Sequence, residues 1–178
     1  MACCSTFSVA TVNMTGDVLP TKDAFDPWHG NPDASWAHGV FGGLTIPEAI
    51  KKFQDRPDIY QEAFMFMGGK AFAFYFPVIE HHLYSVPNLD SNHDDWEDPC
   101  AWIIAKGIEA QFDYRDNHNV LHLARRVLEL ASFVQDNIRR FEPYLYGDLS
   151  PESVSDAWVA LVKTIQSLKK PPAPSTQS

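Results

Sequence analysis

Residues 120–141 read VLHLARRVLELASFVQDNIRRF. Apolar side chains recur in this stretch at alternating steps of four and three, at Val120, Ala124, Val127, Ala131, Val134, Ile138 and Phe141. This spacing places them along one face of an α-helix, which can be buried against neighbouring elements. The sequence therefore predicts a long core helix here, and this helix decides the fold class.

Helical patterns continue on both sides of this stretch. Downstream, Ser150-Pro151-Glu152 precedes an apolar stripe that runs to Leu168, and upstream Asp98-Pro99 precedes an apolar segment that ends at Phe112. Proline is favoured in the first turn of a helix because its missing N–H would have no helical partner there. We predict one helix on each side of the central one.

Further helices are predicted between residues 45 and 83. The sequence Thr45-Ile46-Pro47-Glu48 is a capping box, and the helix that it begins should end near Arg56. Apolar residues at helical spacing follow over residues 60–67 and 72–83. Pro77 lies inside the last pattern and cannot donate a backbone hydrogen bond, so we expect a kink or a break there.

The first 44 residues differ from the rest of the chain. Residues 6–13 could form a strand, for which Val18-Leu19 is a nearby pairing candidate, and prolines and glycines interrupt the remainder. Trp28-His29-Gly30 and Trp36-Ala37-His38-Gly39 fall in what we expect to be a long loop. We predict an irregular N-terminal segment that includes one short strand or hairpin.

Together these patterns predict a mainly α protein, a compact bundle of five or six helices. The chain has 178 residues, which suits one domain, and its 45% hydrophobic content is too high for a disordered chain. We expect a single globular domain over 1–170, with 1–44 as the irregular segment and 45–170 as the helical core. Residues 171–178 should form a disordered tail.

The charge of the chain is concentrated in one segment. The net charge is −9, and residues 90–116, with eight acidic and two basic side chains, carry six of those nine negative charges. Nucleic-acid binding requires a basic surface that displaces counterions from phosphates, so we predict no nucleic-acid partner. A basic protein is the partner that this charge favours.

The sequence also indicates a cellular compartment. No stretch approaches the roughly 18 apolar residues that a membrane span requires, and the N-terminus lacks the pattern of a secretory signal. The three cysteines, Cys3, Cys4 and Cys100, suggest no disulfide framework. We expect a cytoplasmic protein without a membrane partner, in which Cys100 is buried and inert.

The acidic segment supplies the first candidate binding site. Its partner-binding residues are predicted to be Asp94, Asp95, Trp96, Glu97 and Asp98. Trp96 would anchor the partner while the carboxylates steer its approach. Residues 90–94 also match the first five positions of a calcium-binding loop, but Asp95 and Ala101 stand where that loop needs glycine and glutamate.

Trp28 and Trp36 are the second candidate binding element, because long ordered loops and exposed tryptophans often mark binding surfaces. The alternative is that both indoles fold back onto the helices and cap the core.

Four histidines form a candidate metal site. His118 and His122 stand four residues apart on the predicted core helix, and helix packing could bring His81 or His82 to them. Arg125 would share their face and repel a cation, so we predict no bound metal. The sequence also contains no phosphate loop, dinucleotide fingerprint or nucleophile elbow, and we predict no cofactor.

The aromatic run over residues 64–76 is expected to form core, or alternatively to line a cavity for a small apolar ligand.

These observations favour a non-enzymatic, acidic protein-binding module that engages a basic partner, for example an inhibitor or an immunity-type protein. Two alternatives stay open: a metal-dependent hydrolase with a His/Asp cluster, and a helical domain that binds a small apolar ligand.

Overall fold

The structure, a computed structural model, describes residues 18–87, 100–113, 117–141 and 151–168. These residues form helices and no strand, which confirms the mainly α prediction for the described part of the chain. The α-helices are α1 (Lys22–Phe25), α2 (Pro32–Phe41), α3 (Ile46–Asp55), α4 (Pro57–Tyr60), α5 (Ala63–Phe66), α6 (Gly69–Ser85), α7 (Ala101–Asp113), α8 (Ala124–Asp136) and α9 (Pro151–Leu168). Three short 3₁₀ turns, η1 (Asn117–Asn119), η2 (Leu121–Leu123) and η3 (Ile138–Arg140), flank α8.

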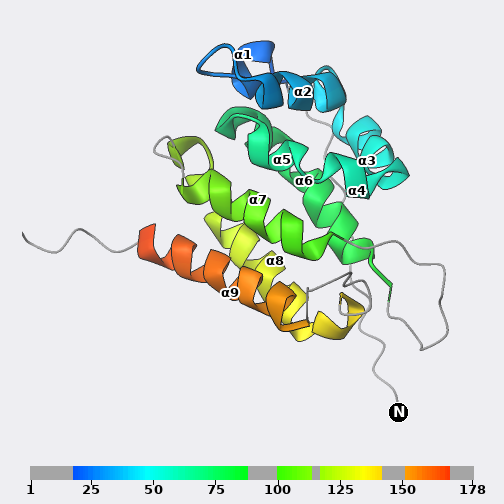
Figure 1. The fold of residues 1–178 in the computed structure, drawn as a ribbon, viewed down its shortest axis with the longest axis vertical. Coiled ribbons are helices and arrows are strands. Elements are labelled where there is room, and N and C mark those ends of the chain that lie inside the picture. The colour runs from blue at the N-terminus through cyan, green and yellow to red at the C-terminus, as the bar shows by residue number, and fades with distance from the viewer. Residues whose placement is uncertain (1–17, 88–99, 114–116, 142–150, 169–178) are drawn as a thin grey trace, which may run out of the picture.

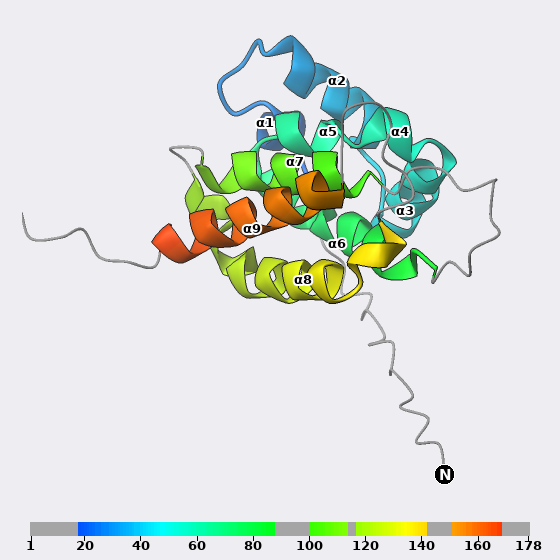
Figure 2. The same cartoon turned by 60° about the horizontal axis from the view of Figure 1, so that its bottom comes forward.

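The helices stack along the long axis of the molecule (Figure 1). The α1 and α2 helices form one end, the α3 to α6 helices lie in the middle, and α7, α8 and α9 pack together at the other end. The α6 helix contacts α1, α3, α7 and α8, so it is the central helix of the bundle. The turned view in Figure 2 shows α9 lying along α7, with α8 beside it. None of the described helices is both long and apolar enough to cross a membrane.

Two buried aromatic residues connect these groups of helices. The Trp158 indole of α9 is fully buried and donates a hydrogen bond to the carbonyl oxygen of Ala101, at the start of α7, over 3.1 Å. The Tyr75 hydroxyl of α6 lies 2.6 Å from the Phe41 carbonyl oxygen and 2.8 Å from that of Leu44. Burial raises the pKa of Tyr75 to about 12, so its hydroxyl stays protonated and remains a donor at neutral pH.

The bounds of three helices agree with the sequence. The capping box begins α3, where the Glu48 carboxylate accepts hydrogen bonds from the Thr45 N–H at 2.8 Å and from its hydroxyl at 2.7 Å. This helix ends at Asp55, one residue before the predicted end. The α7 and α9 helices occupy the predicted segments.

The predicted long helix over residues 120–141 is divided in the structure. Only residues 124–136 are α-helical, and 3₁₀ turns precede and follow them. Asn137 ends α8, because its side-chain amide donates a hydrogen bond to the Phe133 carbonyl oxygen at 2.8 Å. Asparagine side chains compete in this way for backbone hydrogen bonds, and they favour helix ends over helix interiors.

Two predictions about the middle of the chain need correction, one of them in part. The α6 helix does not break at Pro77, because a proline removes only one hydrogen bond and the buried faces of the helix hold the two halves together. The kink that was predicted as the other possibility stays a prediction. Residues 60–67 do not form one helix, and the chain instead makes the separate short helices α4 and α5.

The prediction of an irregular segment before residue 45 is wrong for residues 22–41, most of which belong to α1 and α2. The start of α2 is capped, since the Asn31 side chain accepts a hydrogen bond from the Asp33 N–H at 2.9 Å and Pro32 occupies the first turn. Val18 and Leu19 do not form a strand. The candidate strand at 6–13 and the tail at 171–178 lie outside the described residues.

Candidate functional site

Both N-terminal tryptophans lie at the surface. Trp28 is 60% exposed in the turn after α1, and Trp36 is 39% exposed on α2. The buried face of α2 is made by other residues, Ala34, Ala37 and Phe41. Both indoles are thus partly exposed and neither belongs to the buried core, and their role as a binding element stays a prediction.

Asp26 holds the turn that carries Trp28. Its Oδ2 oxygen accepts hydrogen bonds from the backbone N–H groups of Gly30 at 2.6 Å and Asn31 at 3.1 Å. The turn also places His29 at φ 58° and Gly30 at φ 107°, a region that glycine adopts easily and other residues rarely do. A single carboxylate thus holds the backbone at the second left-handed residue and at the residue that follows it.

The electrostatics of this turn predict a pH dependence. Burial acts to raise the pKa of Asp26, but the backbone N–H groups of Gly30, Asn31 and His29 outweigh it and hold the pKa below its ordinary value. The ionised carboxylate therefore stabilises the turn above the ordinary aspartate pKa of about 3.9, and this contribution is lost as the pH falls through the lower folded pKa.

We expect the NMR signal of the Gly30 amide proton to titrate with a midpoint below about 3.9, and the exchange of that proton to accelerate below this midpoint. Asp26→Asn should abolish the titration. A midpoint at or above the ordinary aspartate value would contradict the role assigned to these hydrogen bonds.

A pocket of about 180 Å³ lies beside Trp28. It is formed where α1 and the following turn meet the start of α6, the end of α7 and η1. Its polar and charged lining residues are Asp23, Asn31, Lys70, Gln111, His118 and Asn119. Its apolar lining includes Met65 and Phe66, from the aromatic run that the sequence singled out.

The close approach of α1 to the start of α6 shapes this pocket. The Gly68 N–H donates a hydrogen bond to the Phe25 carbonyl oxygen at 2.7 Å. A Cβ atom on Gly68 would lie 2.5 Å from the Ala24 carbonyl oxygen and 2.8 Å from Cδ of Pro27. Glycine is therefore required at residue 68 by the packing of backbone against backbone.

Gln111 connects α7 to the chain segment that precedes α6. Its side chain is almost completely buried, at 4% exposure. Its Nε2 lies 2.9 Å from the Phe64 carbonyl oxygen, 3.2 Å from that of Met65 and 2.7 Å from that of Met67. These carbonyls lie at the end of α5, where backbone acceptors lack helical donors, so Gln111 caps that helix from a distant part of the chain.

The four candidate metal ligands do not converge. His81 is exposed on α6, and the His82 ring packs edge-on against Phe53, with 4.9 Å between ring centroids. His118 and His122 are exposed in the separate turns η1 and η2, not on one helix as predicted. Within the described ranges, no three His, Cys, Asp or Glu side chains are grouped closely enough to hold a metal ion.

The structure tests only some of the other residues predicted from the sequence. The predicted acidic binding site lies outside the described residues and stays a prediction; it consists of Asp94, Asp95, Trp96, Glu97 and Asp98. Cys100 is buried, as expected, at 2% exposure and immediately before α7. The aromatic run is mostly core, because Phe64, Phe72 and Phe76 are fully buried.

Sequence reasoning missed the pocket. Its walls come from four separate parts of the chain, near residues 23–34, 65–70, 111 and 118–119, and no local pattern connects them. One signal was readable, since Gln111 continues the buried stripe of Ile104 and Ile108 at helical spacing. A polar residue at a core position must find hydrogen-bond partners, and it therefore indicates a specific contact.

Comparisons of this chain with models of known protein families, with curated proteins and with solved structures gave no match.

Proposed function

We propose that this protein is a non-enzymatic binding module that engages a basic protein through a surface formed by Trp28, Trp36, Asp23 and Asp33. We call these four residues the tryptophan surface. The observation that supports the proposal most directly is the exposure of two indoles, 60% for Trp28 and 39% for Trp36, at one end of the molecule. Tryptophan is enriched among the residues that dominate binding energy at protein interfaces.

Each exposed indole has a carboxylate nearby. Asp33 precedes Trp36 by three residues on α2, so both side chains lie on the same face of that helix. Asp23 and Trp28 line the same pocket, and the Asp23 side chain is 81% exposed. An indole face beside a carboxylate suits an arginine side chain, because the guanidinium can stack on the ring and pair with the acid.

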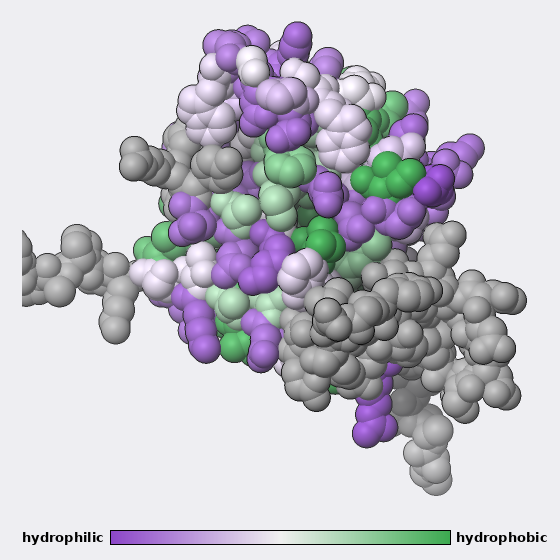
Figure 3. Space-filling view, viewed as in Figure 1, coloured by the Kyte–Doolittle hydropathy of each residue, from purple (hydrophilic) through white to green (hydrophobic). Residues whose placement is uncertain are grey.

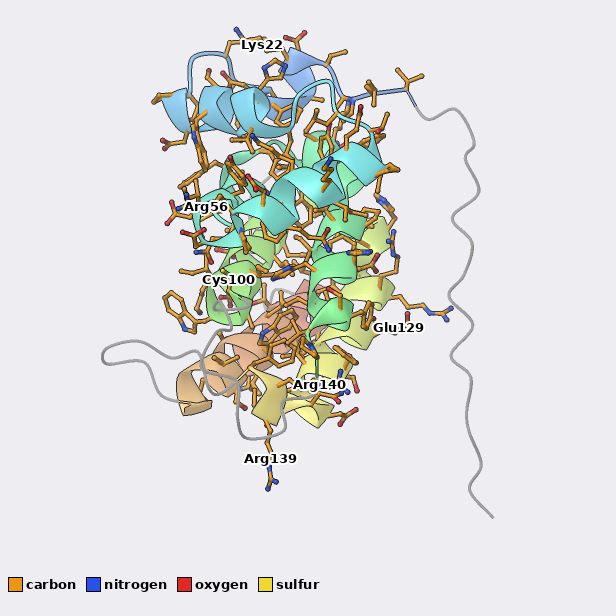
Figure 4. All side chains as sticks on the ribbon, turned by 90° about the vertical axis from the view of Figure 1, so that its right-hand side faces the viewer. Lys22, Arg56, Cys100, Glu129, Arg139 and Arg140 are labelled. Carbon is orange, nitrogen blue, oxygen red and sulfur yellow. The ribbon has the colours of Figure 1, made fainter. Side chains whose placement is uncertain are left out.

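The net charge of the chain agrees with a basic partner. The chain carries a net charge of −9, which attracts cationic proteins and speeds their association. The end formed by α1 and α2 shows hydrophilic and weakly polar surface in Figure 3, as expected for an exposed binding rim. Figure 4 shows Arg139 at the end of the molecule opposite to α1 and α2, and Lys22 on α1, at the same end as the tryptophan surface.

The proposed setting is the cytoplasm, and an inhibitor or immunity-type protein that neutralises a basic toxin is one form that the function could take. The acidic binding site predicted from the sequence would contribute four more carboxylates and one more indole to partner binding, from Asp94, Asp95, Trp96, Glu97 and Asp98. Charge reversal there should slow association with the partner that the tryptophan surface binds.

The test is affinity capture from the native cells, followed by binding measurements with the captured protein. The Trp28→Ala, Trp36→Ala double variant should bind the partner at least about tenfold more weakly, because interface tryptophans commonly contribute more than 1 kcal/mol each. Neither side chain belongs to the buried core, and the far-ultraviolet circular dichroism spectrum of the variant checks that it folds.

Val159→Ala provides the control, since Val159 is 38% exposed on α9 and lies outside the tryptophan surface. The captured protein should be basic, and its binding should weaken with added salt. The proposal fails if the double variant binds as the wild type does, or if Val159→Ala loses binding equally.

A further inference from the structure

The chain carries a basic, proline-rich segment directly after α9. Residues 169–174 read KKPPAP, and they lie outside the described residues. Each proline fixes its own φ at about −65°, so three prolines in four residues favour the polyproline II conformation, which needs no packed core. Pro171 and Pro174 stand one turn of that conformation apart, so both rings face the same side. The sequence therefore suits binding to another surface in extended form.

The tryptophan surface has the chemistry that recognises such a segment. Proline-rich segments bind to surfaces lined by aromatic side chains, because their stiff conformation loses little entropy on binding. Trp28 and Trp36 present exposed indoles at the end formed by α1 and α2 (Figure 1). The pocket of about 180 Å³ beside Trp28 holds the volume of roughly six water molecules, which is room for a proline ring.

The charges of the two sides are complementary. The segment begins with two lysines, whereas residues 18–41 contain three aspartates and one lysine. The Asp23 side chain is 81% exposed, and Asp33 is exposed in the first turn of α2. Lys70 also lines the pocket and would repel another lysine there. The prolines of the segment therefore suit the pocket, and its lysines suit the carboxylates.

The separation of α9 from α2 decides which molecule supplies the segment. The α9 helix packs on α7, α7 on α5, and α5 on α2, and Figure 1 shows these helices one after another along the long axis. Packed helices lie about 8–10 Å apart, so these steps amount to roughly 24–30 Å. Six residues in the polyproline II conformation span only about 19 Å. The segment is thus too short to lie across the tryptophan surface of its own molecule.

We infer that residues 169–174 of one molecule bind the tryptophan surface of a second copy, with proline rings against the indoles and lysines paired with Asp23 and Asp33. The inference rests on the tryptophan surface of the proposed function and names a second copy of this chain as a ligand of it. Because the segment and the surface belong to different ends of the molecule, the contact is head-to-tail and can repeat from one molecule to the next. A basic partner would compete with the segment for the same residues.

Sedimentation of the full chain tests the inference. The weight-average mass should rise with protein concentration and decrease with added salt, which screens the pairs between lysines and aspartates. The Trp28→Ala, Trp36→Ala and Pro171→Ala, Pro174→Ala double variants should each associate at least about fivefold more weakly. Ser175→Ala, which changes the residue after the segment, should associate as the wild type does.

A synthetic peptide of residues 168–176 shows where the segment binds. In NMR titrations of the full chain, the peptide should shift the indole N–H signals of Trp28 and Trp36 to saturation. A peptide with glutamine in place of both lysines should bind about fivefold more weakly, because it loses two exposed ion pairs.

A chain that stays monomeric at every concentration overturns the inference, since a segment folded back on its own molecule would give that result. Equal association of the wild type and the tryptophan double variant would place the contact elsewhere and overturn it as well. Neither result affects the proposed function, which is tested with the captured basic protein instead.

Discussion

Replacing Gly68 with alanine is expected to lower the free energy of unfolding by about 2–3 kcal/mol. The new Cβ atom would lie 2.5 Å from the Ala24 carbonyl oxygen and 2.8 Å from Pro27 Cδ. Neither neighbour is the end of a flexible side chain, so α1 would have to move away from α6. That movement would break the hydrogen bond from the Gly68 N–H to the Phe25 carbonyl oxygen.

The measurement is urea-induced unfolding of the variant, compared with Gly39→Ala. Gly39 lies inside α2, and no atom lies within 4 Å of the position of its Cβ. Alanine there should raise stability by about 0.5–1 kcal/mol, because it favours the helix over the unfolded chain. If both variants unfold at the same urea concentration, α1 separates from α6 at little cost and the packing argument is wrong.

Replacing Gln111 with leucine should lower the free energy of unfolding by about 2–3 kcal/mol, because carbonyl groups of the α5 end would stay buried without donors. Leucine has nearly the same volume, so the cavity effect is small. Gln111→Glu should cost at least as much at neutral pH, since a carboxylate would then face three carbonyl oxygens.

Thermal unfolding of these variants is compared with that of Gln166→Leu, on the exposed face of α9. The control should change stability by less than about 0.5 kcal/mol, as surface substitutions usually do. Equal stability of Gln111→Leu and the wild type would show that the hydrogen bonds to the end of α5 contribute nothing net.

The parts of the fold that the sequence predicted are those encoded by neighbouring residues. The capping box at Thr45 and the start signal at Pro151 each act within one helical turn, and the structure begins helices at both. The sequence does not predict α1 and α2, because the prolines and glycines around them are typical of loops. Asn31-Pro32 is in fact a helix start.

The candidate site was less predictable than the fold. The exposure of Trp36 depends on which face of α2 packs inward, and Ala34 and Ala37 decide that face. The exposure of Trp28 depends on the turn after α1, which the sequence does not predict. The spacing of His118 and His122 suggested a shared helix, but the chain makes two separate 3₁₀ turns there. Periodicity predicts the face of a helix only where the helix is continuous.

The packing of α9 on α7 has a consequence for synthesis of the protein. Trp158 of α9 is fully buried, and its indole N–H donates a hydrogen bond to the carbonyl oxygen of Ala101, 57 residues earlier in the chain. Until α9 has emerged from the ribosome, α9 does not yet cover the face of α7 against which it packs in the folded protein. The bundle should therefore reach its native packing only after translation has passed residue 168, and chaperones that bind apolar segments would meet the α7 face before then.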